Sequence, residues 1–298
     1  MKKIIPYRWA EAKLNKGEIL FNTHDGFTQA IQDGFFFIEK PKSIKLSYGD
    51  LFANEFYKDK KGECNDEYRG YSVFYSSHLG KREGYFLRKE DQVEQFFLEK
   101  SLWEKVFPNE LIVLANEMQY FAMQILEAIL KRLNIPIELW DKATGYNLSG
   151  RGTYHFTFNH FRPSVRARGL NIHKDSGWIT ILRSLEPDLE IFRKQEWIPI
   201  LPKEDNFIVN FGCAMEILTR DTDIPVAAVA HRVTEQKERN LSDRFSYALF
   251  VDSSLDKELC EGLYRYHPTD GLLLEANFEE FLDNIVHKTY EKDTQGLY

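Results

Sequence analysis

The sequence predicts an α+β fold whose core is a double-stranded β-helix (jelly roll), with a helical N-terminal part and a C-terminal helix. Short apolar runs separated by turn signals follow residue 150, and one long amphipathic helix precedes it. Aromatic residues make up 14% of the chain, which favours a strand-rich core over a helical bundle. With 298 residues, 43% of them apolar, the chain is long enough to bury such a core.

The N-terminal region, residues 1–150, is expected to be mostly helical. Residues 25–41 predict a short helix that ends near Gly34, followed by a buried strand of three phenylalanines and an isoleucine. A longer helix is predicted to begin at Pro108 and to end at residues 134–136, because proline favours the first turn of a helix. Its apolar residues recur every three or four positions, which is the period of an amphipathic helix.

The second region, residues 151–298, is expected to hold the jelly roll and the C-terminal helix. Eight antiparallel strands at this spacing are typical of two facing sheets. The predicted strands are 153–161, 176–184, 189–194, 197–202, 206–212, 214–220, 225–233 and 244–252. Helices are predicted to return at 254–264 and 277–292, and we expect the last helix and the tail 293–298 to cover the mouth of a cavity.

Composition narrows the classes of function. The formal net charge of -7 argues against a nucleic acid or an anionic membrane as a partner, which leaves a small molecule as the expected one. No apolar run approaches the length that a membrane-spanning helix needs. The 3 cysteines are too far apart for a disulfide framework or a cysteine-rich zinc site, so a cytoplasmic location is expected. The oligomeric state stays open.

A histidine and an aspartate with one residue between them, His173 and Asp175, form a candidate metal site. The pair is weak evidence alone, because a chain of this composition contains about one such triplet by chance. His231 strengthens it, since it ends a later apolar strand whose neighbours place it inside the barrel. Two neutral imidazoles and one carboxylate form the facial triad that suits non-haem Fe(II) oxygenases.

A further pair of residues is a candidate for binding a carboxylate. Arg244 and Ser246 lie two residues apart, on the same face of one predicted strand, where a guanidinium and a hydroxyl can hold a carboxylate together. His160 and Arg162 share a strand face in the same way. Arg and Ser on a half-buried strand commonly face solvent, and taken alone Arg244 and Ser246 would be expected to do so. Because they follow the metal motif in the chain, a carboxylate-binding role is favoured instead.

These motifs, in this order, resemble the isopenicillin N synthase-like family of 2-oxoglutarate- and Fe(II)-dependent oxygenases. The resemblance rests on residues 173–182, 206–219, 231–233 and 244–250 and extends to 30–41 and 102–108. It implies that His173, Asp175 and His231 bind Fe(II) and act in catalysis. It also implies that Arg244 and Ser246 receive the distal carboxylate of 2-oxoglutarate, the co-substrate used with O2.

Under this resemblance the chain is expected to hydroxylate, desaturate or cyclise a small metabolite, with release of succinate and CO2. One departure concerns the strand before His173, where many relatives have Asn-Tyr-Tyr-Pro and this chain has His160, Phe161, Arg162 and Pro163. His160 and Arg162 therefore become candidates for contacts to the ketoacid or to a substrate carboxylate.

Three alternative functions share part of this pattern. The synthase that names the family needs no 2-oxoglutarate and uses its arginine and serine for substrate, so the Arg244 and Ser246 pair does not separate a dioxygenase from an oxidase. A non-catalytic jelly-roll binding protein is disfavoured by the intact metal motif. A halogenase is disfavoured because Asp175 occupies the position that a halide needs.

Overall fold

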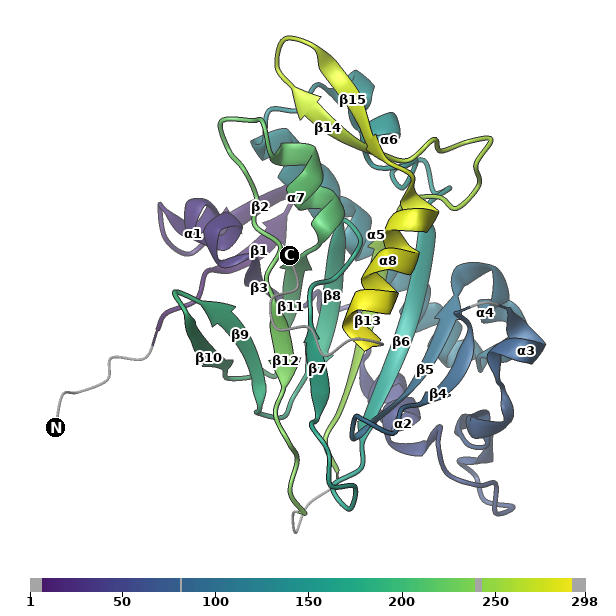
Figure 1. The fold of residues 1–298 in the computed structure, drawn as a ribbon. Helices are drawn as coiled ribbons and strands as arrows, with labels where there is room; N and C mark the ends of the chain where they lie inside the picture. The colour runs from purple at the N-terminus through teal and green to yellow at the C-terminus, as the bar shows by residue number, and fades with distance from the viewer. Residues whose placement is uncertain (1–6, 81, 239–242, 291–298) are drawn as a thin grey trace, which may run out of the picture.

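The computed structural model describes residues 7–80, 82–238 and 243–290, and two facing sheets form its centre (Figure 1). The larger sheet has nine strands. In spatial order they are β2 (Glu18–Phe21), β1 (Glu11–Asn15), β3 (Phe35–Glu39), β11 (Asn206–Phe211), β8 (Ile179–Ser184), β13 (Phe245–Asp252), β6 (Thr153–Phe161), β5 (Val93–Glu99) and β4 (Gly84–Leu87). The smaller sheet has four: β10 (Glu196–Ile200), β9 (Leu189–Arg193), β12 (His231–Val233) and β7 (Leu170–His173).

Helices lie against both faces of the larger sheet, and the yellow α8 crosses the front of β13 and β6 in Figure 1. The helices are α1 (Gly26–Asp33), α2 (Ser47–Glu55), α3 (Ser76–Leu79), α4 (Lys100–Val106), α5 (Asn109–Arg132), α6 (Trp140–Ala143), α7 (Cys213–Thr219) and α8 (Phe278–Tyr290). Short 3-10 turns are η1 (Asp66–Tyr68), η2 (Tyr71–Val73) and η3 (Ile137–Leu139), and β14 (Leu263–His267) pairs with β15 (Gly271–Ala276). Among the described helices, none has both the length and the apolarity needed to cross a bilayer.

The elements predicted for the N-terminal part are confirmed. Helix α1 ends at Gly34, whose φ of 80° is in the left-handed region that glycine adopts without strain, and the buried strand β3 follows at once. Helix α5 begins directly after Pro108, and its buried residues repeat with the predicted helical period. Strands β1 to β5 also join the larger sheet, so the regions 1–150 and 151–298 share one continuous sheet.

The jelly-roll fold is confirmed, with differences in four segments. Residues 214–220 were expected as a strand and form α7 instead, because the buried Met215, Leu218 and Thr219 follow a helical spacing. Residues 225–233 contribute only the three-residue strand β12, and residues 170–173 form β7, which was not among the predicted strands. Residues 254–264 are turns that lead into β14 rather than a helix.

Strand β6 separates two environments by simple alternation. Its even-numbered residues Tyr154, Phe156 and Phe158 are fully buried in the core beneath α2, α4 and α5. Its odd-numbered residues face the smaller sheet, because successive side chains of a strand point to opposite faces. The apolar core therefore lies on one side of β6, and the space between the two sheets lies on the other.

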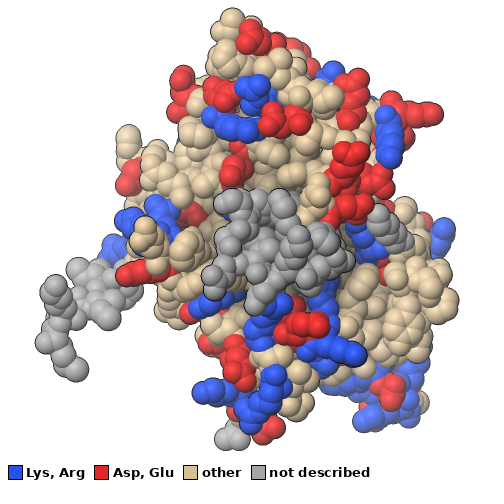
Figure 2. Space-filling view, in the orientation of Figure 1, with Lys and Arg blue, Asp and Glu red and all other residues tan. Residues whose placement is uncertain are grey.

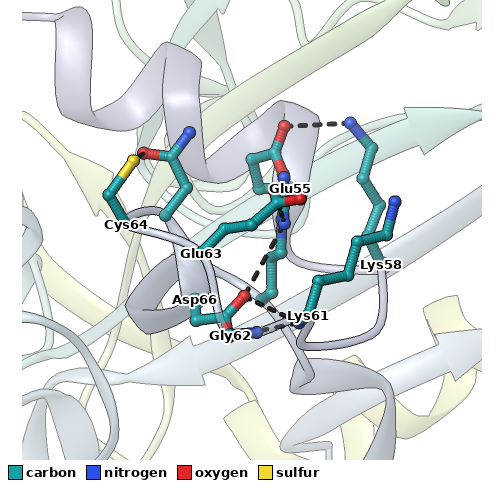
Figure 3. Close-up of polar contacts among 9 residues, drawn as sticks. Glu55, Lys58, Lys61, Gly62, Glu63, Cys64 and Asp66 are labelled. Carbon is teal, nitrogen blue, oxygen red and sulfur yellow. Dashed lines mark hydrogen bonds and ion pairs between the residues drawn. The ribbon is translucent and has the colours of Figure 1, made fainter.

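The segment after α2 is held in place by an ion-pair network (Figure 3). The side chain of Arg69 is only 9% exposed, and it pairs with the carboxylates of Glu55 and Glu63. Lys58 Nζ lies 2.9 Å from Glu55 Oε1. Burial raises the pKa of Glu55, but the hydrogen bonds from Lys58 and Arg69 outweigh it, so the pKa is lowered. This network fixes the segment that follows α2 to the C-terminal end of that helix.

Phe52 of α2 joins the N-terminal helices to the sheet. Its ring is fully buried and lies 4.5 Å from the ring of Phe158 and 4.7 Å from that of Tyr71, measured between centroids. Edge-to-face contacts of this kind add to the free energy gained by burying the rings. Phe52 is therefore a central packing residue of the core.

We predict that Phe52→Ala lowers the free energy of unfolding by about 3–5 kcal/mol, because it leaves a cavity among rings that cannot collapse into it. Urea denaturation measures the change. Tyr120→Ala on α5 is the matched control: this side chain is 69% exposed, so the expected change is within about 0.5 kcal/mol. Equal stability of the Phe52→Ala variant and the wild type would contradict the packing described.

Candidate metal centre and active-site cavity

The pairing of two short strands brings the three candidate metal ligands together. Strands β7 and β12 are antiparallel, and their register sets His173 opposite His231, with ring centroids 4.2 Å apart. Asp175 follows β7 and is buried. Its Oδ1 lies 3.8 Å from His173 Nε2 and 3.6 Å from His231 Nε2. One ligand atom from each residue therefore lies within 4.8 Å of the others.

Hydrogen bonds orient each of these three side chains. His173 Nδ1 donates to the carbonyl of Asn171 over 2.9 Å, and His231 Nδ1 donates to the carbonyl of Val229 over 3.1 Å. Each Nε2 therefore carries the lone pair and faces Asp175, whose Oδ2 accepts a 3.1 Å hydrogen bond from Asn210. Such outer contacts are the usual support of metal ligands.

The electrostatics of the site favour a neutral imidazole at His173. Burial, together with the positive charge that His231 carries when protonated, lowers the pKa of His173 to about 4. A neutral imidazole is the form that binds a metal ion, so His173 is ready to do so near pH 7. Two neutral nitrogens and one carboxylate oxygen, all on one side of an open space, fit one Fe(II) ion.

The ligand set opens into a cavity of about 270 Å³ between the two sheets. Arg244 and Ser246 line the same cavity, so the structure brings these two residues to one site with the candidate metal ligands. The remaining wall combines aromatic and aliphatic side chains with a small number of polar ones. Among the lining residues are Phe86, Gln95, Phe97, His155, Thr157, Asn159, Phe161, Thr180, Leu182, Asn210, Phe250, Asp252 and Leu282.

Arg244 is buried at the start of β13. Its Nη2 donates to Ser184 Oγ over 3.1 Å, its Nε donates to the carbonyl of Pro187 over 3.0 Å, and its guanidinium lies 4.6 Å from the ring centroid of Phe161. Ser246, two residues further along, faces the same cavity. A buried guanidinium fixed in this way offers a permanent positive charge to an anionic ligand.

A hydrogen-bonded row of polar side chains, which sequence reasoning missed, extends from Ser246 across the sheet. Asn159 Nδ2 donates to Ser246 Oγ over 3.2 Å, and Gln95 Nε2 donates to Asn159 Oδ1 over 2.7 Å. Gln95 Oε1 and Thr157 Oγ1 are buried and have no hydrogen-bond partner among the described residues. Buried polar atoms are normally satisfied, so these two oxygens fit a cavity that receives a polar ligand.

The structure corrects the expectation for His160 and Arg162. His160 is on the opposite face of β6, where Nδ1 lies 2.6 Å from Glu94 Oε1 and the ring stacks 3.7 Å from that of Tyr57. Arg162 follows β6, and its Nε donates to the carbonyl of Gln92 over 3.0 Å. Neither residue lines the cavity, because the odd-numbered positions of β6 face it. Alternation counted from the inward-facing His155 would have identified Asn159.

Charged pairs and one helix border the mouth of the cavity. Leu282 of α8 lines it, and an ion pair between Arg82 and Asp283 joins the same helix to the segment before β4. Lys174 Nζ lies 3.0 Å from Glu216 Oε2. Acidic and basic side chains both appear on this face in Figure 2. The tail 293–298, expected to help cover the mouth, lies outside the described residues.

Comparisons with known proteins agree with this geometry. The family model described as 2OG-Fe(II) oxygenase superfamily matches residues 152–253, a segment that contains all three candidate ligands as well as Arg244 and Ser246. Codeine O-demethylase of Papaver somniferum is 34% identical over 144 residues, which are 46% of this chain and 38% of that protein. The 2-oxoglutarate-dependent dioxygenase citB of Monascus ruber is 27% identical over 245 residues, 71% of this chain and 69% of that protein.

A third relative, Protein DMR6-LIKE OXYGENASE 1 of Arabidopsis thaliana, is 27% identical over 146 residues, 48% of this chain. The matched segment spans 39% of that protein, so this match and the codeine O-demethylase match each cover less than half of the relative. Among solved structures, JOX2 in complex with 2OG, Fe and JA superposes with a TM-score of 0.63 at 20% identity, covering 91% of this chain and 82% of that one.

The dioxygenase for auxin oxidation in rice superposes with a TM-score of 0.64 at 15% identity, covering 93% of this chain and 94% of that one. These superpositions establish the fold, and the family match falls on the segment that carries the candidate metal ligands. The segment 152–253, which carries the three converging ligands within the jelly roll, therefore belongs to the 2OG-Fe(II) oxygenase superfamily, and the rest of the chain is similar to such oxygenases in fold.

Proposed function

We propose that the chain is an Fe(II)- and 2-oxoglutarate-dependent dioxygenase that oxidises a small metabolite and releases succinate and CO2. One observation carries the proposal: a single cavity is lined both by the three converging ligands and by the buried pair Arg244 and Ser246. Bound Fe(II), 2-oxoglutarate and O2 supply the oxidising chemistry. The protein supplies binding, orientation and the exclusion of water.

In this proposal His173, Asp175 and His231 bind Fe(II). The Nδ1 hydrogen bonds of the two histidines keep each ring from turning, and Asn210 holds the carboxylate of Asp175. Because the three side chains converge from one side, the cavity would leave room for the co-substrates beside a bound ion. Fixed ligands also mean that little reorganisation is needed when the co-substrates bind.

Arg244 and Ser246 are proposed to hold the distal carboxylate of 2-oxoglutarate. A carboxylate taken out of water is costly unless a fixed cation compensates it, and Arg244 is a buried cation in the cavity wall. Ser246 adds a hydroxyl that Asn159 holds in place. The apolar walls and helix α8 limit the access of water to the reacting groups.

The proposal includes a small-molecule substrate and a cytoplasmic location. A cavity of about 270 Å³ is of a size for small ligands rather than for a macromolecule. Codeine O-demethylase and the dioxygenase citB are named for reactions of small molecules or for the same co-substrate. Free thiols at Cys64, Cys213 and Cys260 support a reducing compartment.

We predict that Asp175→Ala and His231→Ala each reduce bound iron from one ion per chain to almost none and abolish succinate formation, because two ligands do not hold Fe(II) firmly. Metal analysis, circular dichroism and a succinate assay measure the outcome, and the fold is expected to persist. Asp270→Ala, a change in the β14–β15 hairpin, is the control. Full activity of the His231→Ala variant would refute the assignment.

Zn(II) is expected to bind at the same three residues and to inhibit succinate formation.

We predict that Arg244→Lys raises the KM for 2-oxoglutarate by about tenfold with a smaller effect on kcat, because lysine keeps the charge but loses the two-pronged geometry. Arg162→Ala serves as the control and leaves this KM unchanged, since Arg162 does not line the cavity. Succinate release and oxygen consumption are measured together. If oxygen is consumed and no succinate forms with any substrate, the enzyme is an oxidase like the synthase that names the family.

A further inference from the structure

A cluster of side chains around His155 in the cavity wall lies outside the groups proposed to bind iron or 2-oxoglutarate. His155 on β6 lines the cavity, and its side chain is 14% exposed. Its Nε2 lies 3.0 Å from Glu83 Oε1, and the second oxygen of Glu83 accepts a 2.8 Å hydrogen bond from the backbone N–H of Glu99. Both carboxylate oxygens are therefore engaged, so Glu83 holds the imidazole in one orientation.

The bond to Glu83 decides which nitrogen of His155 is left for a ligand. Nε2 carries the proton that it donates to the carboxylate, and Nδ1 takes part in no hydrogen bond among the described residues. Although burial lowers it, the pKa of His155 is raised overall by the hydrogen bond and the charge of Glu83, with a further contribution from Asp252. The raised pKa favours the protonated ring, in which Nδ1 is also a donor.

Thr157 provides a second donor beside His155. It is two residues further along β6, on the same face, at the spacing of roughly 6.4–6.8 Å between alternate strand residues. The residue is only 1% exposed, and its hydroxyl is one of the buried oxygens without a partner among the described residues. The small Ala248 is its neighbour on β13, which leaves space beside the hydroxyl. A ligand atom that accepts a hydrogen bond would satisfy this group.

The walls around these two donors are aromatic. Phe97 is the register partner of Thr157 on β5, and Phe250 is the register partner of His155 on β13. Phe86 meets Phe97 edge to face, with centroids 5.6 Å apart. All three rings line the cavity and remain partly exposed. Partly exposed aromatic rings around a few fixed polar groups are typical of a site that binds an apolar ring.

Charge limits the kind of acceptor that fits. Glu83 brings one carboxylate to this end of the cavity, and the buried Asp252, whose Oδ1 accepts a 3.1 Å hydrogen bond from Ser176, brings a second carboxyl group. The nearby Arg82 is already paired with Asp283 of α8. Because Glu83 already compensates the positive charge of a protonated His155 and Asp252 adds a further carboxyl group, these side chains favour an uncharged oxygen over an anion.

We infer that His155 and Thr157 bind the carbonyl oxygen of an uncharged, ring-containing substrate whose apolar body packs against Phe86, Phe97 and Phe250. This inference rests on the proposed function and specifies its substrate class. Glu83 acts as a positioning residue, because it reaches the substrate only through His155. The carbonyl contact sets which edge of the ring faces the metal centre.

The test measures binding of three probes of similar size by calorimetry, with the full chain loaded anaerobically with Fe(II) and 2-oxoglutarate. The probes are 1-tetralone, which has a ring carbonyl, tetralin, which lacks it, and 1-naphthoic acid, which is charged near pH 7. We expect 1-tetralone to bind most tightly and its carbonyl stretch to shift to lower frequency in the infrared spectrum. Tighter binding of tetralin or of the acid, or no binding of 1-tetralone, overturns the inference.

Variants locate the contact. Thr157→Val keeps the shape, and because the hydroxyl is unpartnered it is expected to leave the melting temperature unchanged or higher while the Kd for 1-tetralone rises about threefold to tenfold. His155→Phe is expected to raise that Kd about tenfold or more, and His155→Gln, which retains a donor, by less. The Kd for tetralin is expected to stay the same in all three variants. His78→Phe, at an exposed residue, is the control and is expected to leave the Kd for 1-tetralone unchanged.

The two hypotheses fail in different ways. If the wild-type chain binds 1-tetralone with this dependence on His155 and Thr157 but does not bind 2-oxoglutarate, the proposed function fails and the substrate site stands. If 2-oxoglutarate binds and 1-tetralone binds equally to the wild type and to Thr157→Val and His155→Phe, the substrate site fails and the proposed function stands.

Discussion

The register between β7 and β12 is the constraint on which the candidate site depends. It sets His173 opposite His231, and a slip of one residue would turn one of the two imidazoles to the other face of the sheet. Each histidine donates Nδ1 to the carbonyl two residues before it, so the same local device orients both rings. Asp175 is the second residue after His173, so it lies close to both imidazoles. Asn210 of the larger sheet donates a hydrogen bond to its carboxylate.

The two faces of strand β6 have different roles. Its even-numbered aromatic residues pack with Phe52 in the core, and its odd-numbered residues His155, Thr157 and Asn159 line the cavity. Substitutions on the cavity side therefore change what binds with little loss of packing. A protein family that keeps the buried face and varies the open one can accept many substrates on one scaffold.

Local patterns in the sequence were enough to predict the long helix α5 and most strands of the jelly roll, and to select three candidate metal ligands that the structure brings together. The two ligand-bearing strands were harder, because β7 and β12 are too short to show an alternating pattern and are held by their partners. His160 and Arg162 were chosen from the wrong face of β6, since period two does not say which face is inside. The pairing of β1 to β5 with later strands depends on contacts between residues far apart in the chain, which no local window contains.

The turn at Gly34 packs against the segment that precedes His231, and this contact limits how the chain can be shortened. A Cβ at Gly34 would come within 2.6 Å of Val229 Cβ, and Ala227 N donates to the carbonyl of Ile31 just before it. Val229 in turn supplies the carbonyl that orients His231. The segment 152–253 alone would keep Val229 and His231 but lose the contacts that Gly34 and Ile31 make with residues 227–229, so the smallest unit that keeps the candidate metal centre well ordered is longer than that segment.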